Sequence, residues 1–578
     1  MNITEALKVL HAQRSVGAEV HYVLACSFTP LHLGTLLSAH LQRRDAEHRV
    51  VVDTGIYGDL PGNVEAIGQQ RVEGAAVVFE WADLDPRLGL RVLGGWHPRD
   101  LPDIVANAAA RARQYADILR RVAARVPVAV CLPTLPLPPV SYTAGWQYAE
   151  LPIALSDLVA DFARELSGMP RLRIVAPQHV DERSPLAGRL DVRSYLRTGF
   201  PYGLAHASVL AEDLARLLKP PVPKKGLVTD LDGTVWQGIL GEEGMTGVSW
   251  DLDHKSHIHG LYQQLLQSLA EAGVLIAVAS KTDPSVITEA LRSKDLLLQF
   301  DRLFPIEAHW EPKSVSVSRI LDAWNIGADS VVFVDDSPLE LAEVKAVHPG
   351  VECLLFPTDD ENAVYALLQT LRDLFGKDAV SSEDTLRLDS IRRSAELRAA
   401  LPEGHDQQDH FLSQAAQELT VTVVKSTAEP RALELINKTN QFNLNGRRLS
   451  EAEWAAYLER PDALALLLAY RDRYGPLGQI AVVAGRIEGS RFHVDSWVLS
   501  CRAFTRRIEY ACLDFLFEHY HVAEIVLNYR ETAKNHLVRA LLTDLTGREP
   551  DGCVRLTSLT FGDKRPPLAI TYHSDAAP

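Results

Sequence analysis

Long apolar runs, cysteines and excess positive charge are all scarce in this sequence of 578 residues. No apolar run reaches about 18 residues, so we expect no transmembrane helix and no membrane partner. The six cysteines show no CxxC spacing, which disfavours a disulfide framework and a structural zinc site and fits a cytoplasmic protein. The first residues show no basic stretch followed by an apolar one, so we expect no secretory signal. With 59 basic and 75 acidic residues, a formal net charge of −16, we expect no nucleic-acid partner either.

The composition and the pattern of apolar runs predict an α/β multidomain protein. The chain is 47% hydrophobic, which is enough for several buried cores, and its length favours about three or four domains. The first 220 residues alternate short apolar runs with helical patterns, which indicates a parallel sheet covered by helices. The lysine- and proline-rich segment Lys219–Lys225 follows and has the composition of a linker. The predicted domains are residues 1–220, residues 221–376, a helical linker at 377–415 and residues 416–578.

The most informative motif is Asp230-Leu-Asp-Gly-Thr, which directly follows an apolar strand. Two carboxylates at one strand end can reach a common site, where one attacks phosphorus and the other transfers a proton. Later strand ends and loops add a hydroxyl, an ammonium group and an acidic pair in the same order along the chain. Such groups suit a phosphate and a hard cation, Mg²⁺. The later elements are Ser280, Lys313 and Asp335-Asp336.

This order of motifs resembles the haloacid dehalogenase (HAD) superfamily of aspartyl-phosphate phosphatases. The span from Asp230 to Ser280 leaves room for a flap and one helix (258–272), so we expect a capless site that can admit a group carried on a protein. Within the superfamily the chain is similar to the FkbH-type branch, from which Gly233 and Thr282 depart. The motifs that carry this similarity are residues 230–244, Ser280-Lys281, Trp310–Lys313, Phe333–Glu340, Asn437–Asn443 and Leu499–Arg502.

The resemblance implies a bifunctional acyltransferase/phosphatase that converts 1,3-bisphosphoglycerate to a glyceryl thioester on an acyl carrier protein for polyketide biosynthesis. Two alternatives stay open: a Mg²⁺-dependent phosphomonoesterase with accessory domains, and a related enzyme that delivers lactyl units. The resemblance also assigns roles to individual side chains. Asp230 would be the nucleophile and Asp232 the general acid/base, with Thr234, Ser280, Lys281 and Lys313 on the phosphate and Asp230, Asp232, Asp335 and Asp336 on Mg²⁺.

An acyl group that passes through an enzyme thioester needs a second nucleophile, and Cys501 is the best candidate. It follows the predicted strand 493–500, precedes a helix expected from about residue 507, and is followed by arginines, beginning with Arg502. A helix N-terminus and guanidinium groups lower the pKa of a thiol. We therefore predict that Cys501 carries the acyl group. Cys26, which also ends a strand but lacks neighbouring arginines, is the alternative.

The last domain weakly resembles the Gcn5-related acyltransferase (GNAT) fold, without that fold's usual pyrophosphate loop. Its polar stretch 437–443 contains Asn440 and Asn443, which together with Arg502 are candidates for binding pantetheine or a glyceryl hydroxyl. The other interpretation of this stretch is a polar helix cap followed by a turn. The arginine-rich segment 387–398 is a candidate docking patch for an acidic carrier.

The first domain resembles SGNH hydrolases of flavodoxin-type fold at one point, the strand-turn-helix around Cys26-Ser27. An active member also needs an Asp-x-x-His pair, which residues 180–215 lack. We therefore predict an SGNH-like domain that is inactive and serves for docking.

Overall fold

The computed structural model describes residues 1–12, 17–292, 296–400, 414–427, 429–504 and 506–575. The chain forms two compact units, Met1–Pro221 with Leu449–Tyr457, and Val222–Arg448 with Leu458–Pro578. The short excursion into the first unit was not expected from the sequence, which assigns these residues to the last domain. It is held there by an ion pair of 3.0 Å between Arg173 and Glu451. Among the described residues, none of the helices combines the length and the hydropathy needed to cross a membrane.

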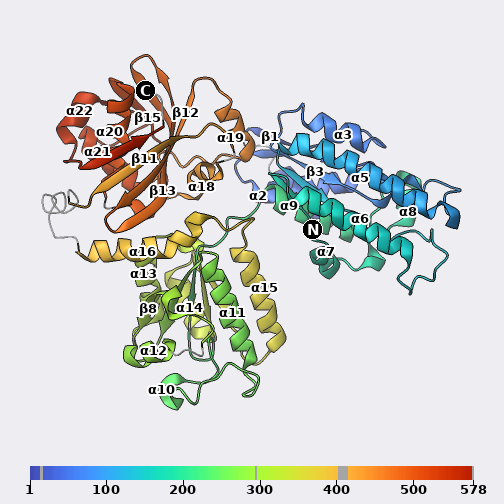
Figure 1. Ribbon diagram of the computed structural model, residues 1–578, viewed down its shortest axis with the longest axis horizontal. Helices are drawn as coiled ribbons and strands as arrows, with labels where there is room; N and C mark the ends of the chain where they lie inside the picture. Colours follow the sequence, from blue (N-terminus) through green and yellow to red (C-terminus); the bar gives the residue numbers. More distant parts are fainter. Residues whose placement is uncertain (13–16, 293–295, 401–413, 428, 505, 576–578) are drawn as a thin grey trace. The chain divides into compact units, whose positions relative to one another are not determined.

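The first unit is built on a five-stranded parallel sheet with the order β2-β1-β3-β4-β5. Every residue of β3 and β4 is buried, as expected for a parallel sheet with helices on both faces (Figure 1). One core cluster includes side chains of α3, α5 and α6, and the other includes side chains of α1, α2 and α9. The strands are β1 (Glu19–Ala25), β2 (Arg49–Thr54), β3 (Gly74–Val78), β4 (Val128–Cys131) and β5 (Leu172–Ile174). The helices are α1 (Ile3–Ala12), α2 (Leu31–Arg44), α3 (Leu60–Ile67), α4 (Trp81–Leu84), α5 (Leu101–Ala123), α6 (Glu150–Ser167), α7 (Pro177–Arg183), α8 (Val192–Thr198), α9 (Leu204–Leu218) and, from the excursion, α19 (Glu451–Leu458).

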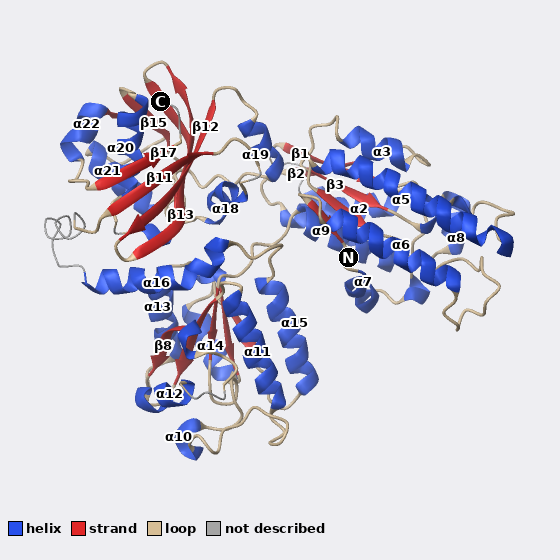
Figure 2. Ribbon diagram, viewed as in Figure 1, coloured by secondary structure: helices blue, strands red, loops and turns tan. Residues whose placement is uncertain are grey.

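The second unit contains two sheets (Figure 2). The first of them is again parallel, with the order β10-β9-β6-β7-β8. Between β6 and β7 lie only the short helix α10, the helix α11 and two isolated bridges, Asp232 with Trp236 and Gln237 with Ser249, so this fully described stretch holds no cap domain. The strands are β6 (Gly226–Thr229), β7 (Leu275–Ser280), β8 (Leu303–Ala308), β9 (Val331–Asp335) and β10 (Glu352–Leu355). The helices are α10 (Leu240–Glu243), α11 (His257–Glu271), α12 (Pro284–Leu291), α13 (Lys313–Trp324), α14 (Pro338–Val347), α15 (Glu361–Phe375) and α16 (Ser382–Ala400).

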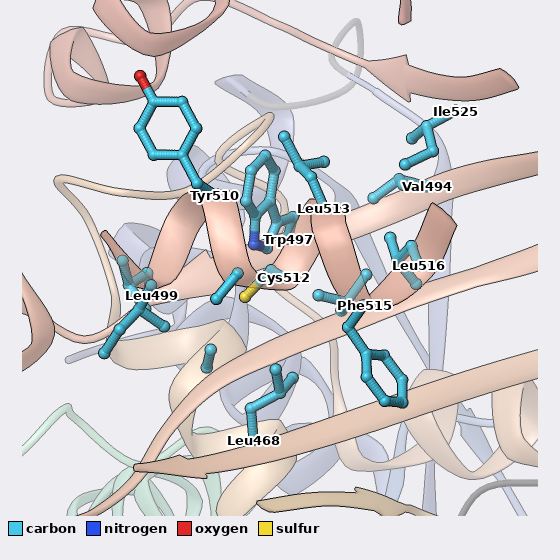
Figure 3. Packing of buried hydrophobic residues seen from close by; sticks show 14 of the residues in the cluster. Leu468, Val494, Trp497, Leu499, Tyr510, Cys512, Leu513, Phe515, Leu516 and Ile525 are labelled. Carbon is cyan, nitrogen blue, oxygen red and sulfur yellow. The ribbon is translucent and has the colours of Figure 1, made fainter. Parts of the chain in front are cut away.

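The second sheet of this unit has seven strands in the order β16-β15-β14-β13-β12-β11-β17. The strands from β11 to β14 pair antiparallel, whereas β15 joins β14 and β17 joins β11 in parallel. Helix α20 packs its buried face on this sheet, where Cys512 lies beside Trp497 (Figure 3). The strands are β11 (Gln417–Val423), β12 (Ala463–Asp472), β13 (Gly475–Glu488), β14 (Arg491–Leu499), β15 (Glu524–Asn528), β16 (Cys553–Thr557) and β17 (Ile570–Ser574). The helices are α18 (Pro430–Lys438), α20 (Ile508–Tyr520), α21 (His536–Thr546) and α22 (Ser558–Lys564).

Helix α16 contacts both sheets of the second unit. Its Arg387 and Arg392 donate to backbone carbonyl oxygens of the parallel-sheet part, at Gly273 (2.8 Å) and Leu303 (2.9 Å). Its Ser394 hydroxyl donates to the carbonyl oxygen of Arg502 (3.2 Å) in the other part. The expectation that the arginines of 387–398 form a free docking patch is therefore wrong for Arg387 and Arg392, because both are used inside the unit.

Candidate functional site

The carboxyl end of the parallel sheet in the second unit gathers the acidic motif and its lysine. Asp230 follows β6, and its backbone N–H donates to the carbonyl oxygen of Val334 in β9 (3.0 Å). That bond fixes Asp230 beside Asp335, the last residue of β9. Lys313 opens α13 and is buried. The sequence prediction that these residues share one site is consistent with this arrangement, because parallel strands end at a common edge.

Lys313 lies between two buried carboxylates. Its Nζ is 2.8 Å from Oδ1 of Asp230 and 2.6 Å from Oδ2 of Asp335. The side chains of all three are at most 8% exposed, so these interactions are shielded from water. One oxygen each of Asp230, Asp335 and Asp336 lies within 4.8 Å of the other two. Two acidic side chains thus contact the ammonium group, and the carboxylate of Asp336 lies near theirs.

The charge balance and the donor atoms of this cluster fit a hard divalent cation. Burial raises the pKa of Asp230, and Lys313 only partly opposes that increase. Burial also raises the pKa of Asp335 and Asp336, with Asp335 adding to the effect at Asp336. One lysine cannot neutralise three carboxylates, whereas a lysine with one divalent ion can. Because all the available ligands are carboxylate oxygens, Mg²⁺ is the chemically suitable ion.

The Asp232 carboxylate does not join this cluster, so its assignment as a metal ligand through that carboxylate is not supported. Its Oδ1 accepts from the Trp236 indole (2.8 Å) and from the backbone N–H of Leu240 (2.9 Å). Its Oδ2 accepts from the Thr282 hydroxyl (3.2 Å). The Thr282 hydroxyl therefore holds the side chain of the expected general acid/base in one orientation.

The three other predicted phosphate ligands differ in their surroundings. Ser280 is buried, and its hydroxyl donates to Thr282 (3.4 Å). The buried hydroxyl of Thr234 has no hydrogen-bond partner among the described residues. Lys281 instead forms an ion pair of 2.7 Å with Glu340. The prediction that Lys281 binds phosphate is thus not supported by its position, whereas Thr234 retains a free hydroxyl.

Cys501 lies in the second unit, in a short helical turn that is separate from the long helix α20. It begins a one-turn 3₁₀ helix, Cys501–Ala503, and α20 starts only at Ile508. The long helix begins close to residue 507, as predicted, but Cys501 lies in the separate one-turn helix before it and not at its N-terminus. The neighbouring arginines are also compensated, because Arg502 binds Glu383 (2.8 Å) and the fully buried Arg506 binds Asp472 (3.0 Å).

A cavity of about 100 Å³ surrounds Cys501 and supplies other cations. Lys225, from the segment predicted to be a linker, lines it and donates to the carbonyl oxygen of Lys438 (3.2 Å). Burial lowers the pKa of Lys225 to about 8, although the charge of Cys501 acts in the opposite direction. Sequence reasoning missed Lys225 because nothing in its local pattern indicates a site. The polar and charged lining residues are Lys225, Asn325, Ser330, Arg387, Arg431, Glu434, Lys438, Thr439, Asn440, Gln441, Ser500, Cys501 and Arg502.

The polar stretch 437–443 divides between this cavity and a structural turn. Asn440 lines the cavity, and its assignment as a ligand-binding side chain stays a prediction. Asn443 is buried and does not line it; its Nδ2 donates to Thr439 O (3.2 Å), and its Oδ1 accepts from Gly446 N (2.8 Å). The structure therefore gives Asn443 the role of holding a turn, which corrects its assignment as a substrate ligand.

The turn after β1 in the first unit has no activated nucleophile. Cys26 is buried, donates to the carbonyl oxygen of Phe28 (3.3 Å), and burial raises the pKa of its thiol to about 12. Ser27 hydrogen-bonds to Asp83, whose pKa burial raises to about 6. His206 contacts the Thr134 and Ser184 hydroxyls, both at 2.9 Å, and burial lowers its pKa to about 3. In the contacts of the described residues, Ser27 and His206 are not partners.

The comparisons with known proteins bear on the fold. No protein-family model matches the chain, and no curated protein matches it. Among solved structures, it is similar to the N-terminal part of the protein BF1531 from Bacteroides fragilis, described as containing a phosphatase domain complexed with Mg. The TM-score is 0.52 at 18% identity, and the match covers 66% of this chain and 100% of that one. This similarity establishes a shared multidomain α/β fold.

Proposed function

We propose that this protein is a Mg²⁺-dependent phosphatase of HAD type whose nucleophile is Asp230. The observation that carries the proposal is the buried cluster in which Lys313 lies between Asp230 and Asp335, with Asp336 as a third carboxylate. The similarity to a protein part with a Mg-bound phosphatase domain supports the same assignment. The described stretch between β6 and β7 holds no cap domain, which suits a substrate attached to another protein.

The reaction at this site needs two carboxylates with different roles. The Asp230 carboxylate attacks phosphorus, the bond from phosphorus to the leaving oxygen breaks, and Asp232 gives that oxygen its proton. Water then attacks the aspartyl phosphate, Asp232 accepts the water's proton, and inorganic phosphate leaves. Bound Mg²⁺ supplies positive charge to the phosphoryl oxygens. Lys313 neutralises the same oxygens, and the Thr282 hydroxyl holds Asp232 in place.

The more specific proposal is a bifunctional acyltransferase/phosphatase that makes a glyceryl thioester on an acyl carrier protein from 1,3-bisphosphoglycerate. The Cys501 thiolate attacks the acyl carbon, and the acyl-phosphate C–O bond breaks with release of inorganic phosphate. Asp230 removes the phosphate ester at the other end of the donor before the acyl phosphate enters the Cys501 cavity, because the two centres lie at opposite ends of β6. The carrier's pantetheine thiol then takes the acyl group from Cys501, which regains its thiol. The placement of Cys501 in a cavity with Lys225 favours this reading over a plain phosphomonoesterase.

The test distinguishes the bifunctional enzyme from a plain phosphatase by measuring two products, the acyl adduct on the enzyme and the released phosphate. The enzyme is incubated with Mg²⁺ and 1,3-bisphosphoglycerate, generated in place without a carrier, and examined by intact-protein mass spectrometry and by phosphate release. We expect a glyceryl adduct that Cys501→Ala abolishes. Phosphate release with no adduct on the wild type would leave the plain phosphatase. If a lactyl donor labels Cys501 better than the glyceryl donor does, the acyl group that the enzyme transfers is lactyl.

A further inference from the structure

Basic residues outnumber acidic ones in the lining of the Cys501 cavity, although Arg387 is paired with Asp384 and Lys438 with Glu434. Five basic residues but one acidic residue, Glu434, line it among the described residues, in a protein with a net charge of −16. Such an excess inside a small cavity attracts anions. The five basic residues are Lys225, Arg387, Arg431, Lys438 and Arg502.

Two of these guanidinium groups have donors left over. Nε of Arg431 and Nη1 of Arg502 are buried and have no hydrogen-bond partner among the described residues. The Arg502 side chain is only 5% exposed, so water does not readily satisfy its free donor. The buried Oε1 of Gln441, another lining residue, also lacks a partner there, but it is an acceptor and does not bind an anion. Buried donors of this kind indicate a ligand that is absent from the described contacts.

The other donors of the same arginines hold them in fixed orientations. Nη2 of Arg502 is 2.8 Å from Glu383, whose other carboxylate oxygen accepts from the backbone N–H of Gln479 (2.7 Å). Nη1 of Arg431 is 2.8 Å from Glu434. Burial, and then the charge of Arg431, lower the pKa of Arg502. Oε2 of Glu383 lies near both guanidinium groups, 2.8 Å from Arg502 and 4.0 Å from Arg431. The donors left for a ligand are therefore Nε of Arg431 and Nη1 of Arg502.

We propose that Arg431, Arg502 and Lys225 form a phosphate-binding subsite beside the Cys501 thiol. This subsite deepens the function proposed above and rests on it for the source of the phosphate. The phosphate belongs either to the acyl donor or to the phosphopantetheine arm of the carrier. A cavity of about 100 Å³ holds several water molecules, and therefore a phosphate group.

The subsite is distinct from the phosphatase centre. Lys225 immediately precedes β6 and Asp230 immediately follows it. At a rise of about 3.3 Å per residue, the two positions are about 16 Å apart along the strand. The Cys501 cavity therefore lies at the amino end of the sheet and has its own phosphate recognition.

The experiment uses the alkylation of Cys501 by iodoacetamide, followed by peptide mass spectrometry, with inorganic phosphate as the probe. Phosphate at ten times its dissociation constant should slow alkylation of the wild type about tenfold. Arg431→Gln and Lys225→Met should each lose most of this protection. Arg460→Gln removes an exposed arginine that pairs with Asp462 and should keep it. Having two cavity variants guards against the misfolding of one of them.

Further measurements show which molecule supplies the phosphate. They also distinguish a failure of this subsite from a failure of the proposed phosphatase activity. Asp230→Asn should keep the protection, because the anion does not bind there. Stronger protection by phosphopantetheine than by pantetheine assigns the subsite to the carrier arm, and stronger protection by 3-phosphoglycerate than by glycerate assigns it to the donor. If phosphate does not slow alkylation of the wild type, or slows it equally in both cavity variants, the subsite is refuted. A wild type that shows protection but no Mg²⁺-dependent phosphate release refutes only the phosphatase.

Discussion

The two ends of strand β6 carry opposite chemistry. At its carboxyl end, Asp230 belongs to a cluster of three carboxylates with one lysine. At its amino end, Lys225 belongs to a cavity lined by five basic residues and a cysteine. The first arrangement suits a divalent cation and nucleophilic attack on phosphorus. The second suits an anion and nucleophilic attack on an acyl carbon. The comparison shows one unit that holds groups of opposite charge at the two ends of a single strand.

A third region, the turn after β1 in the first unit, sharpens this contrast. Cys26 ends a strand as the sequence predicts, yet it has no cation beside it in the described contacts, and burial raises its pKa to about 12. A strand-end cysteine therefore does not make a nucleophile without charged neighbours. The position of Cys501 beside Lys225 is the property that distinguishes the two thiols.

The largest expected effect follows from the carboxylate end. Asp230→Asn removes the nucleophile and should reduce phosphate release by at least about a thousandfold, because no other group replaces a covalent nucleophile. Phosphate release is measured with 1,3-bisphosphoglycerate and Mg²⁺, with circular dichroism as the folding control. Activity within tenfold of the wild type would show that another residue attacks phosphorus.

Removing the metal tests whether the carboxylates at the carboxyl end of β6 need a cation to balance their negative charge. Treatment with EDTA should abolish phosphate release, and added Mg²⁺ should restore it, because one lysine cannot balance three buried carboxylates. Mg²⁺ at about 100 times its dissociation constant should also stabilise the fold by about 2.7 kcal/mol. Thermal unfolding with and without Mg²⁺ measures this effect. Asp336→Asn is the matched variant, and an unchanged Mg²⁺ shift in it would remove Asp336 from the metal site.

Thr282 tests how strictly Asp232 must be oriented. Thr282→Val keeps the shape but removes the hydroxyl that donates to Asp232. We expect kcat to fall about tenfold, a fraction of the roughly 10²–10⁴-fold that a general acid/base contributes. Thr288→Val changes a threonine whose hydroxyl bonds to a helix carbonyl oxygen and serves as the control. If kcat in Thr282→Val equals that of the wild type, the hydroxyl does not position Asp232.

Phosphate binding in the Cys501 cavity, at the amino end of β6, should depend on pH because it involves Lys225. Burial lowers its pKa to about 8, and the groups around it are Cys501, Arg387, Lys438 and Asp329. Below pH 8 the lysine is protonated and attracts phosphate, whereas above pH 8 it becomes neutral. The protection of Cys501 by phosphate should therefore weaken a few-fold between pH 7 and 9. The ratio of alkylation rates without and with phosphate measures it, and a Lys225→Met variant with the same pH dependence would contradict this assignment.

The smallest effect is expected in the first unit. Cys26→Ala should leave both phosphate release and the adduct on Cys501 unchanged, because its buried thiol takes no part in either reaction. The loss of a small buried side chain should cost about 1 kcal/mol of stability. Mass spectrometry of the adduct and thermal unfolding measure the two quantities. Loss of the adduct in this variant would move the acyl relay to Cys26.

Local sequence was informative where a motif coincides with a strand end. Asp230, Ser280 and Asp335 were placed at one edge of a sheet because apolar strand patterns end at them, and parallel strands share that edge. The strand β14 and the helix α20 were predicted for similar reasons. These are features that neighbouring residues determine.

The features of the Cys501 cavity that the sequence does not predict depend on contacts between segments that are distant in the chain. Lys225 lies in a stretch with the composition of a linker, so only its contact with Lys438 shows its place in the cavity. Arg502 was expected to activate Cys501, but Glu383 from another helix binds it. The sequence also cannot show that Asn443 holds a turn while Asn440 lines the cavity, because both are asparagines of the same polar stretch.

The most direct test of two separate centres is the mass of the adduct on Asp230→Asn. This variant is incubated with Mg²⁺ and 1,3-bisphosphoglycerate without a carrier and is examined beside the wild type and Cys501→Ala. If the two ends of β6 act independently, Asp230→Asn should carry an adduct on Cys501 that is heavier than the wild-type adduct by one phosphate group. An Asp230→Asn variant with no adduct at all would show that Cys501 cannot be acylated without Asp230, which contradicts the separation.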